Sequence, residues 1–188
     1  MGSKKTFIDN YIEDIKLNLV NSDLIKNSAE FNELLQNTKL NNGRCFFMGN
    51  GASASLASHA SVDFSKQAGL LSMNFNEANL ITCYSNDYGY ENWMKKALEK
   101  YQQQGDIVCL ISVSGESPSI LNCAKYAKEI DIPLVTFTGS DENNSLKQYG
   151  DINFWVDSKA YNIVESIHCL WLTMSIDLLI GKSVYKVS

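Results

Sequence analysis

Hydrophobic positions along the chain alternate between two spacings, one typical of amphipathic helices and one typical of short buried strands. From residue 5 to about 39, apolar side chains recur every three or four positions. A break near Asn21-Ser22 divides this stretch into two expected helices. Helical spacing is also found over the ranges 53–67, 88–103, 118–130, 143–149 and 161–180. Between them, short apolar runs predict buried strands at RCFFMG, LITCYS, DIVCLISVS, PLVTFTG and INFWV.

This alternation of strands and helices predicts a mostly parallel sheet covered on both faces, a three-layer α/β/α sandwich with five strands. We expect a single domain over 1–188, in which 1–40 form an N-terminal helical extension and 41–188 form the α/β core. Ligands of such sheets bind at the carboxyl ends of the strands. Two loops lie there, 49–53 and 112–117, and both are candidates for a binding site.

Amino-acid composition argues against one class of partner and indicates the cellular compartment. The net charge of −5 argues against a nucleic-acid-binding protein, which needs a clustered basic face. The five cysteines are odd in number and show no CxxC spacing, which favours free thiols in a reducing cytoplasm. We expect no signal peptide, and no uninterrupted apolar run approaches the roughly 20 residues of a membrane span. A cytoplasmic protein that does not enter a membrane is the expectation.

The serine-rich loop SVSGESPS, residues 112–119, ends one expected strand and begins a helix. Ser117 suits the N-cap and Pro118 the first helical position. Hydroxyls, a glycine and the free N–H groups of a helix N-terminus together form a cradle for an anion. A serine-rich turn that only caps the helix is the alternative explanation.

The loop GNGAS, residues 49–53, has the same position after the first strand. Its glycines allow the backbone to approach a ligand closely, and Ser53 could cap the helix that follows. The glycine spacing does not match a dinucleotide-binding fingerprint, and no Gly-Lys-Ser/Thr follows as in a P-loop.

Four motifs in this order carry a resemblance: GNGAS followed by His59, SNDYGYE, ISVSGESPSIL and ESIH. Together they resemble the SIS (sugar isomerase) phosphosugar-binding family, in particular its sedoheptulose 7-phosphate isomerase branch. The resemblance extends from about residue 40 to 181. It implies a flavodoxin-like core, a homotetramer with active sites where subunits meet, and aldose–ketose isomerisation of a sugar phosphate in a surface-polysaccharide heptose pathway.

The resemblance also nominates residues for the substrate. It implies that the serine loop takes the phosphate, and that the first loop and the SNDYGYE motif line the cleft for the sugar. The nominated residues are Asn50, Gly51, Ser53, Asp87, Ser112, Ser114, Ser117 and Asn162. At Asn162 the isomerases usually carry an aspartate, and Glu116 replaces a frequent asparagine. Since Glu116 would repel a phosphate if it pointed inward, we expect it to point to solvent near the start of the helix.

Isomerisation needs a base that moves a proton between C1 and C2, and an acid or metal that polarises the carbonyl. The family pattern supplies a His and a Glu one turn apart, then a Gln and a His on the last helix. The corresponding residues here are His59, Asp63, Glu165 and Thr173. A threonine hydroxyl cannot replace imidazole as a base at neutral pH. The candidate catalytic residues are therefore Asp63 or Glu165 as base, with His59 or a metal as the polarising group.

His59, Asp63 and Glu165 form a valid ligand set for zinc or another divalent metal, and a polar cluster without metal is the alternative. The second histidine, His168, is either a packing residue of the last helix or a nearby substitute for the missing imidazole. Two functions stay open at this point. One is a phosphosugar isomerase; the other is a non-catalytic phosphosugar-binding protein, a sensor or a tetrameric partner of the kind that associates with the replication initiator.

Overall fold

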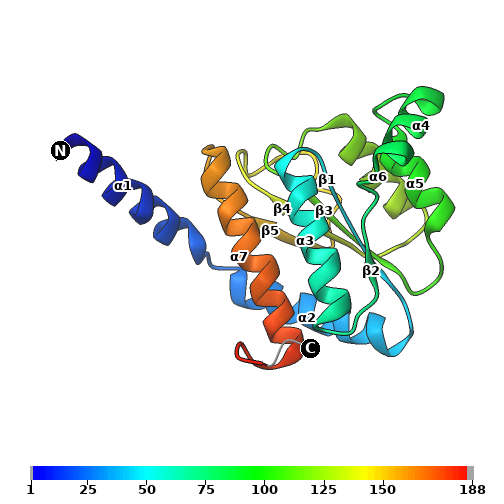
Figure 1. The fold of residues 1–188 in the computed structure, drawn as a ribbon, viewed down its shortest axis with the longest axis horizontal. Helices are drawn as coiled ribbons and strands as arrows, with labels where there is room; N and C mark the ends of the chain where they lie inside the picture. Colours follow the sequence, from blue (N-terminus) through cyan, green and yellow to red (C-terminus); the bar gives the residue numbers. More distant parts are fainter. Residues whose placement is uncertain (1, 186–188) are drawn as a thin grey trace.

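The computed structural model describes residues 2–185 and has three layers, with a parallel sheet between two sets of helices (Figure 1). The strands are β1 (Cys45–Gly49), β2 (Ser72–Met73), β3 (Ile107–Ser112), β4 (Leu134–Thr138) and β5 (Ile152–Trp155). The helices are α1 (Gly2–Leu19), α2 (Leu24–Leu40), α3 (Ala52–Lys66), α4 (Ala78–Tyr88), α5 (Trp93–Tyr101), α6 (Pro118–Glu129) and α7 (Tyr161–Ile180). The strand order β2-β1-β3-β4-β5 is the flavodoxin-like order, which confirms the predicted fold class.

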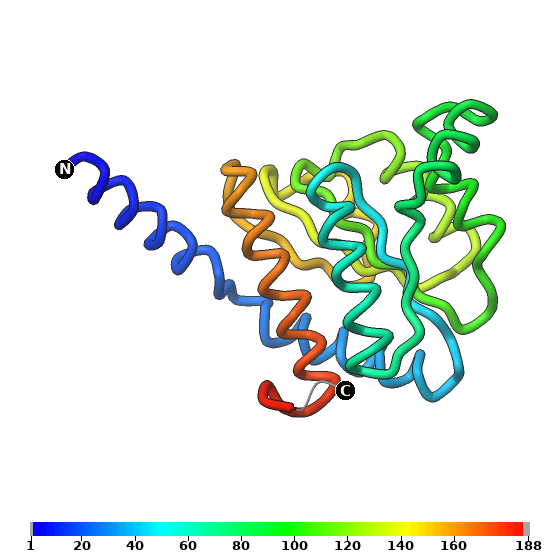
Figure 2. Tube along the Cα trace, viewed as in Figure 1, coloured from blue at the N-terminus to red at the C-terminus, as the bar shows by residue number. Residues whose placement is uncertain are grey.

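The two faces of the sheet bury alternate residues of the same strands, as the pleat of a strand requires. Along β1, Phe47 packs with α2, α3 and α7, while Phe46 and Met48 pack with α5 and α6 on the opposite face. Figure 2 shows α3 and α7 running side by side across one face, and α2 crossing below them. Both faces are therefore closed, which explains why the central strands are apolar throughout.

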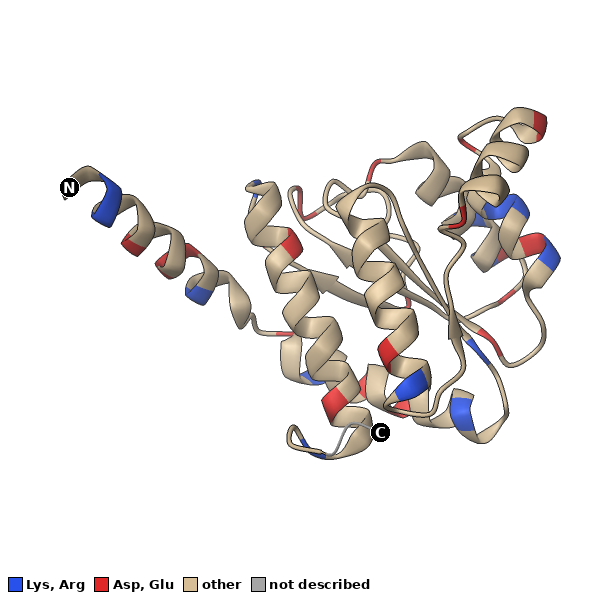
Figure 3. Cartoon of the chain, in the orientation of Figure 1, with Lys and Arg blue, Asp and Glu red and all other residues tan. Residues whose placement is uncertain are grey.

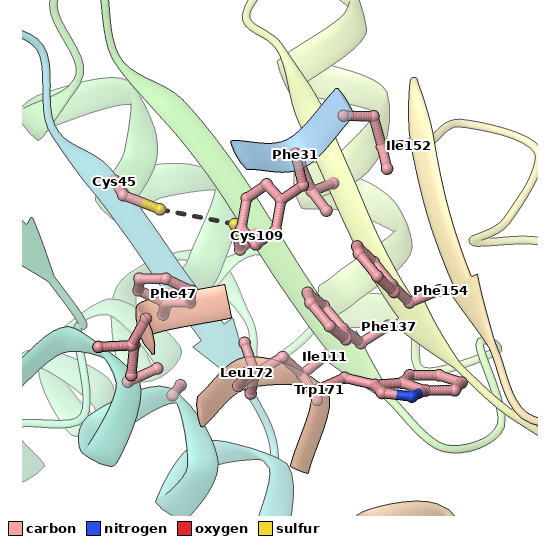
Figure 4. Close-up of a cluster of buried hydrophobic side chains, with 14 of the residues drawn as sticks. Phe31, Cys45, Phe47, Cys109, Ile111, Phe137, Ile152, Phe154, Trp171 and Leu172 are labelled. Carbon is pink, nitrogen blue, oxygen red and sulfur yellow. Dashed lines mark hydrogen bonds between the residues drawn. The ribbon is translucent and has the colours of Figure 1, made fainter. Parts of the chain in front are cut away.

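Aromatic side chains dominate the core on the face that α2, α3 and α7 cover (Figure 4). Phe137 and Phe154 stack with ring centroids 4.6 Å apart, and Phe31 of α2 meets both of them edge-on. The Sγ atoms of Cys45 and Cys109 lie 3.5 Å apart in the same core. Burial, the contact with Cys109 and the nearby Asp106 carboxylate raise the pKa of Cys45 well above its usual value. This thiol is therefore a packing group and not a nucleophile.

α7 is long and apolar enough to cross a membrane by length and composition, with a mean hydropathy of 1.6 over its best 18-residue window. Its sequence has no long uninterrupted apolar run, because polar residues interrupt the apolar ones. Its inner face, which includes Ile167 and Trp171, is buried against α3, α2 and the sheet. The helix is thus a core element of an α/β fold.

Two predicted elements were wrong. The run LITCYS, expected as a strand, lies within α4; Glu77 caps this helix by accepting hydrogen bonds from the backbone N–H groups of Asn79 and Leu80. The second strand is instead the short β2, which offers only two residues to a pattern search. The stretch 143–149, expected as a helix, is a series of turns. The break near Asn21-Ser22 is confirmed by the separation of α1 from α2.

α1 projects away from the three-layer body (Figure 1), and it has no buried residue. Phe7 and Leu17 are 68% and 69% exposed. The indole N–H of Trp171 in α7 donates to the carbonyl of Leu19, which ties the end of α1 to the body. On α1, acidic and basic positions are interspersed (Figure 3). The helix therefore has no face of a single charge, and charge does not explain why its apolar side chains are exposed.

Candidate functional site

A pocket of about 250 Å³ opens where the chain leaves β1 and β3. From β1 the chain proceeds to β2 on one side of the sheet, and from β3 to β4 on the other. This reversal leaves a crevice between the two loops that follow β1 and β3, the usual ligand position in such sheets. The pocket is lined by Asn50, Gly51, Ala52, Ser53, Ile111, Ser112, Val113, Ser114, Ser117, Tyr161 and Glu165. The structure thus brings the two predicted loops together.

The serine loop, residues 112–117, presents hydroxyl protons to this pocket. The backbone N–H of Gly115 donates to Ser112 Oγ (3.2 Å), and that of Glu116 donates to Ser114 Oγ (3.2 Å). Because each hydroxyl oxygen already accepts a hydrogen bond from the loop, its own proton remains free to donate to a ligand. Ser117 is the N-cap residue of α6, as predicted, but its hydroxyl makes no capping bond and lines the pocket instead. The loop is therefore equipped to hold an anion.

The N-termini of three helices meet at the pocket. α3 begins at Ala52, α6 at Pro118 and α7 at Tyr161, each next to a lining residue or at one. Helix N-termini carry free N–H groups and a partial positive charge, so they favour anions such as phosphate. Among the described residues, no lysine or arginine lines this pocket. Its attraction for an anion comes from backbone dipoles.

Asn50, in the loop after β1, has its amide fixed on both sides. Its Nδ2 donates to Ser119 Oγ at the start of α6 (3.0 Å), and its Oδ1 accepts from the Tyr90 hydroxyl (3.1 Å). Tyr90 belongs to the SNDYGYE motif, so this bond connects the motif to the first loop. Ser53 is buried in the first turn of α3 and does not cap that helix, because Gly51 occupies the cap position.

Tyr161 and Glu165 enter the pocket from α7, one helical turn apart. Glu165 is one of the two carboxylates, with Asp63, that the sequence indicates as the candidate base. Tyr161 was not nominated, since an exposed aromatic residue at the start of a helix gives no pattern that distinguishes it from other surface residues. Its side chain is 60% exposed, so it forms the outer wall of the pocket.

His59 and Asp63 lie further along α3. His59 Nε2 and Asp63 Oδ2 are 3.0 Å apart, which confirms that the two side chains share one face of the helix. Relative to Ser53 they lie about 9 to 15 Å along the helix axis. His59 and Thr173 line a common gap of only about 10 Å³ between α3 and α7. The Thr173 hydroxyl donates to the carbonyls of Cys169 and Leu170, so it is occupied within its own helix.

A metal does not fit the predicted ligands as one chain arranges them. Glu165 lines the anion pocket, whereas His59 and Asp63 pair with each other further along α3. Within residues 2–185, no three His, Cys, Asp or Glu side chains are placed to share a metal ion. His59, Asp63 and Glu165 of one chain therefore do not form a joint metal site.

Two nominated substrate residues lie outside the pocket of a single chain. Asp87, near the end of α4, is exposed and accepts a hydrogen bond from Asn86 Nδ2 (2.9 Å). Asn162, in the first turn of α7, is exposed next to the pocket residue Tyr161. Neither is among the lining residues. Their proposed contacts with the sugar therefore stay predictions.

Glu116 is exposed, as expected, but its carboxylate is bound to another segment of the protein. Both of its oxygens accept hydrogen bonds from Ser145, and its side chain does not line the pocket. His168 is a packing residue: it is fully buried, and its Nε2 donates to the carbonyl of Thr138 (3.0 Å). Burial lowers the pKa of His168 to about 4, although the hydrogen bond to Thr138 opposes that shift.

A larger hollow, of about 460 Å³, lies at the opposite edge of the sheet and is lined by Asn37, Asn41, Gln102, Gln103 and their neighbours. α2, α5 and α6 end there, so their carbonyl ends give this hollow a partial negative charge. An anion would be disfavoured at this edge. The smaller pocket is accordingly the candidate site for an anionic ligand.

Comparison with known proteins adds a family to this geometry. The SIS domain family model matches residues 16–139. A phosphoheptose isomerase of Fusobacterium nucleatum is 29% identical over 81% of this chain and 80% of its own length. One from Mycobacterium tuberculosis is 30% identical over 69% of this chain and 68% of its own length. The structure of phosphoheptose isomerase GmhA from Neisseria gonorrhoeae superposes with a TM-score of 0.85 at 21% identity, covering 95% of this chain and 98% of that one.

Proposed function

The chain belongs to the SIS domain family, and from that membership we propose that it is an isomerase of the sedoheptulose 7-phosphate type, which interconverts a ketose phosphate and an aldose phosphate. One observation carries the proposal: the pocket combines an anion cradle with the Glu165 carboxylate. The anion cradle suits the phosphate, and the Glu165 carboxylate suits the proton transfer. The relatives named phosphoheptose isomerase support this substrate class.

The phosphate of the substrate binds in the serine loop. Ser114 and Ser117 donate their hydroxyl protons to it, together with the free N–H groups at the start of α6. The sugar chain then extends toward Gly51 and Ser53, and Asn50 is held ready for a sugar hydroxyl by its bonds to Ser119 and Tyr90.

Glu165 acts as the general base. In the ketose-to-aldose direction its carboxylate removes a proton from C1, giving an enediol, and returns the proton to C2 while the C2 carbonyl oxygen takes up the hydroxyl proton from C1. We assign this role to Glu165 and not to Asp63 because only Glu165 lines the pocket of the described chain. The free N–H groups at the start of α3 stabilise negative charge that develops on the substrate oxygens.

We further propose that the chain assembles as a homotetramer with active sites at subunit contacts, in the cytoplasm. The unburied α1 with its exposed Phe7 and Leu17 supports an assembly, since an isolated helix of this kind is marginally stable. In such an assembly a neighbouring copy could bring its exposed His59 and its half-buried Asp63 to a pocket. Free cysteines support the compartment, because Cys83 is exposed and unpaired in the described chain.

The non-catalytic alternative has one observation in its favour. Thr173 stands where the resemblance places a histidine, and its hydroxyl is occupied by helix carbonyls. A chain with the anion pocket but without the imidazole as acid or base would bind sugar phosphates without converting them.

The deciding experiment follows sedoheptulose 7-phosphate by NMR with the purified chain, once with EDTA and once with added zinc. We expect turnover, and a loss of at least about 100-fold in Glu165→Gln with phosphate binding retained. Ser166→Ala serves as the matched control, since Ser166 is the exposed neighbour on α7. Binding without turnover by the parent chain under both conditions would favour the non-catalytic alternative.

A further inference from the structure

Glu116 is an unusual residue to find within a loop that is suited to a phosphate, since its carboxylate repels a dianion. Its two oxygens are both occupied by one residue of another segment. The backbone N–H of Ser145 donates to Oε1 (2.7 Å), and the Ser145 hydroxyl donates to Oε2 (2.8 Å). Ser145 lies 29 residues later in the sequence, on the turns that follow β4. The carboxylate is thereby held outside the lining of the pocket.

The same turns, residues 141–147, support the serine loop at the adjacent residue. The backbone N–H of Leu146 donates to the carbonyl of Gly115 (3.0 Å). Asn144 is buried beneath the loop, where its Nδ2 donates to the carbonyl of Asp141 (2.8 Å) and its Oδ1 accepts from the N–H of Lys147 (3.0 Å). The serine loop is therefore fastened to a rigid turn segment at two consecutive positions.

The fastening acts on the groups that face the ligand. The N–H of Glu116 donates to Ser114 Oγ, so the position of the Glu116 backbone determines the direction of the Ser114 hydroxyl. An anion site whose donors are already in place avoids the entropy of ordering them on binding. We propose that Glu116 is a positioning residue of the phosphate site, which acts by holding the serine loop to Ser145. This inference rests on the proposed function, because it requires that the loop bind the substrate phosphate.

A positioning role and a merely solvated charge at Glu116 predict opposite changes in phosphate affinity when the side chain is removed. If Glu116 were only a solvated carboxylate, removing it would strengthen phosphate binding, because a like charge would be lost. If it fastens the loop, Glu116→Ala weakens binding. Glu116→Gln keeps an oxygen that accepts from the Ser145 N–H and an amide that can donate to the Ser145 hydroxyl, so it should restore binding. Ser145→Ala removes one of the two bonds and leaves the charge.

The test measures the Kd of inorganic phosphate by ³¹P NMR titration, and KM and kcat for sedoheptulose 7-phosphate. We expect Glu116→Ala to raise the phosphate Kd and the KM about tenfold, Ser145→Ala about threefold, and Glu116→Gln less than about twofold, on the scale of hydrogen bonds to a charged group. The kcat should stay within about twofold in all three, since none of them alters Glu165. Glu142→Ala, a carboxylate removed from the same turns without a bond to the loop, is the matched control.

Thermal unfolding of each variant checks that the fold is intact; both Glu116 variants change an exposed side chain. An Glu116→Ala variant that binds phosphate as tightly as the parent, or more tightly, overturns the inference while the proposed function stands. A parent chain that binds no phosphate overturns both. Equal losses in Glu116→Ala and Glu116→Gln would show that hydrogen bonds to Ser145 do not restore binding, and would also refute the positioning role.

Discussion

The buried His168 should make the stability of this protein depend on pH in a way that one substitution removes. Its ring is fully buried, its Nε2 donates to the carbonyl of Thr138, and its Nδ1 has no partner among the described residues. Burial lowers its pKa from 6.5 to about 4. The folded state therefore holds the neutral ring at pH values where the unfolded chain already binds a proton.

The sign and size of the effect follow from the two pKa values. Well above pH 6.5 neither state protonates His168, and its burial takes nothing from the stability of the fold. As the pH falls from 6.5 toward 4, only the unfolded chain gains the proton, so the free energy of unfolding decreases by up to about 1.4 kcal/mol per pH unit. The loss should reach about 2 kcal/mol at pH 5 and about 3 kcal/mol at pH 4, below which it levels off because the folded state protonates too.

The assay is urea unfolding between pH 4 and pH 8, with His168→Gln as the comparison. The glutamine amide can still donate to the Thr138 carbonyl, and it does not titrate. Carboxylates contribute equally to both proteins, so the difference between the two curves isolates His168. We expect the variant to lose about 3 kcal/mol less than the parent over this range. Parallel curves for the two proteins would refute the lowered pKa and the burial argument behind it.

Three further outcomes are expected. Gly115→Ala should abolish phosphate binding and lower the melting temperature, because a Cβ at this position, where φ is +68°, would lie 2.1 Å from Asn144 Oδ1. Gly51→Ala, with nothing within 4 Å of the added Cβ, should cost only the backbone strain of φ +56° and ψ −127°, about 1 to 3 kcal/mol in thermal or urea unfolding. Thr173→Ala should keep kcat within about threefold of the parent in the NMR assay, because its hydroxyl is already bound by its own helix; a loss of 100-fold would instead make Thr173 a participant. Deleting residues 2–19 should reduce the number of chains per particle found by light scattering, and an unchanged number would show that α1 does not hold the assembly together.

The sequence predicted the layers of the fold and the two loops of the site because both depend on local patterns. Apolar runs identified the central strands, and a serine-rich segment before Pro118 identified the start of α6. The run at 80–85 predicts a strand but lies in α4, since a short apolar run fits either periodicity. Glu77 favours the helix, because its carboxylate accepts hydrogen bonds from the first N–H groups of α4.

The parts of the site that could not be predicted from the sequence depend on contacts between distant segments. Nothing local indicates that Glu116 meets Ser145 or that Tyr90 meets Asn50, since these pairs are 29 and 40 residues apart. His59 and Glu165 were grouped from the family resemblance, and a single chain places them in different hollows. Spacing along a helix predicts only which side chains share a face of that helix.

The convergence of three helix N-termini on one pocket has a consequence for how the sugar specificity of this protein can change. Backbone N–H groups do not titrate, and they are present whichever side chains the helices carry. Affinity for the phosphate should therefore stay nearly constant across the physiological pH range, apart from the ionisation of the phosphate itself. Rim residues such as Tyr161 can then be exchanged to suit a different sugar while the phosphate continues to bind. The anchor of the substrate belongs to the fold, and the choice of sugar belongs to a few replaceable side chains.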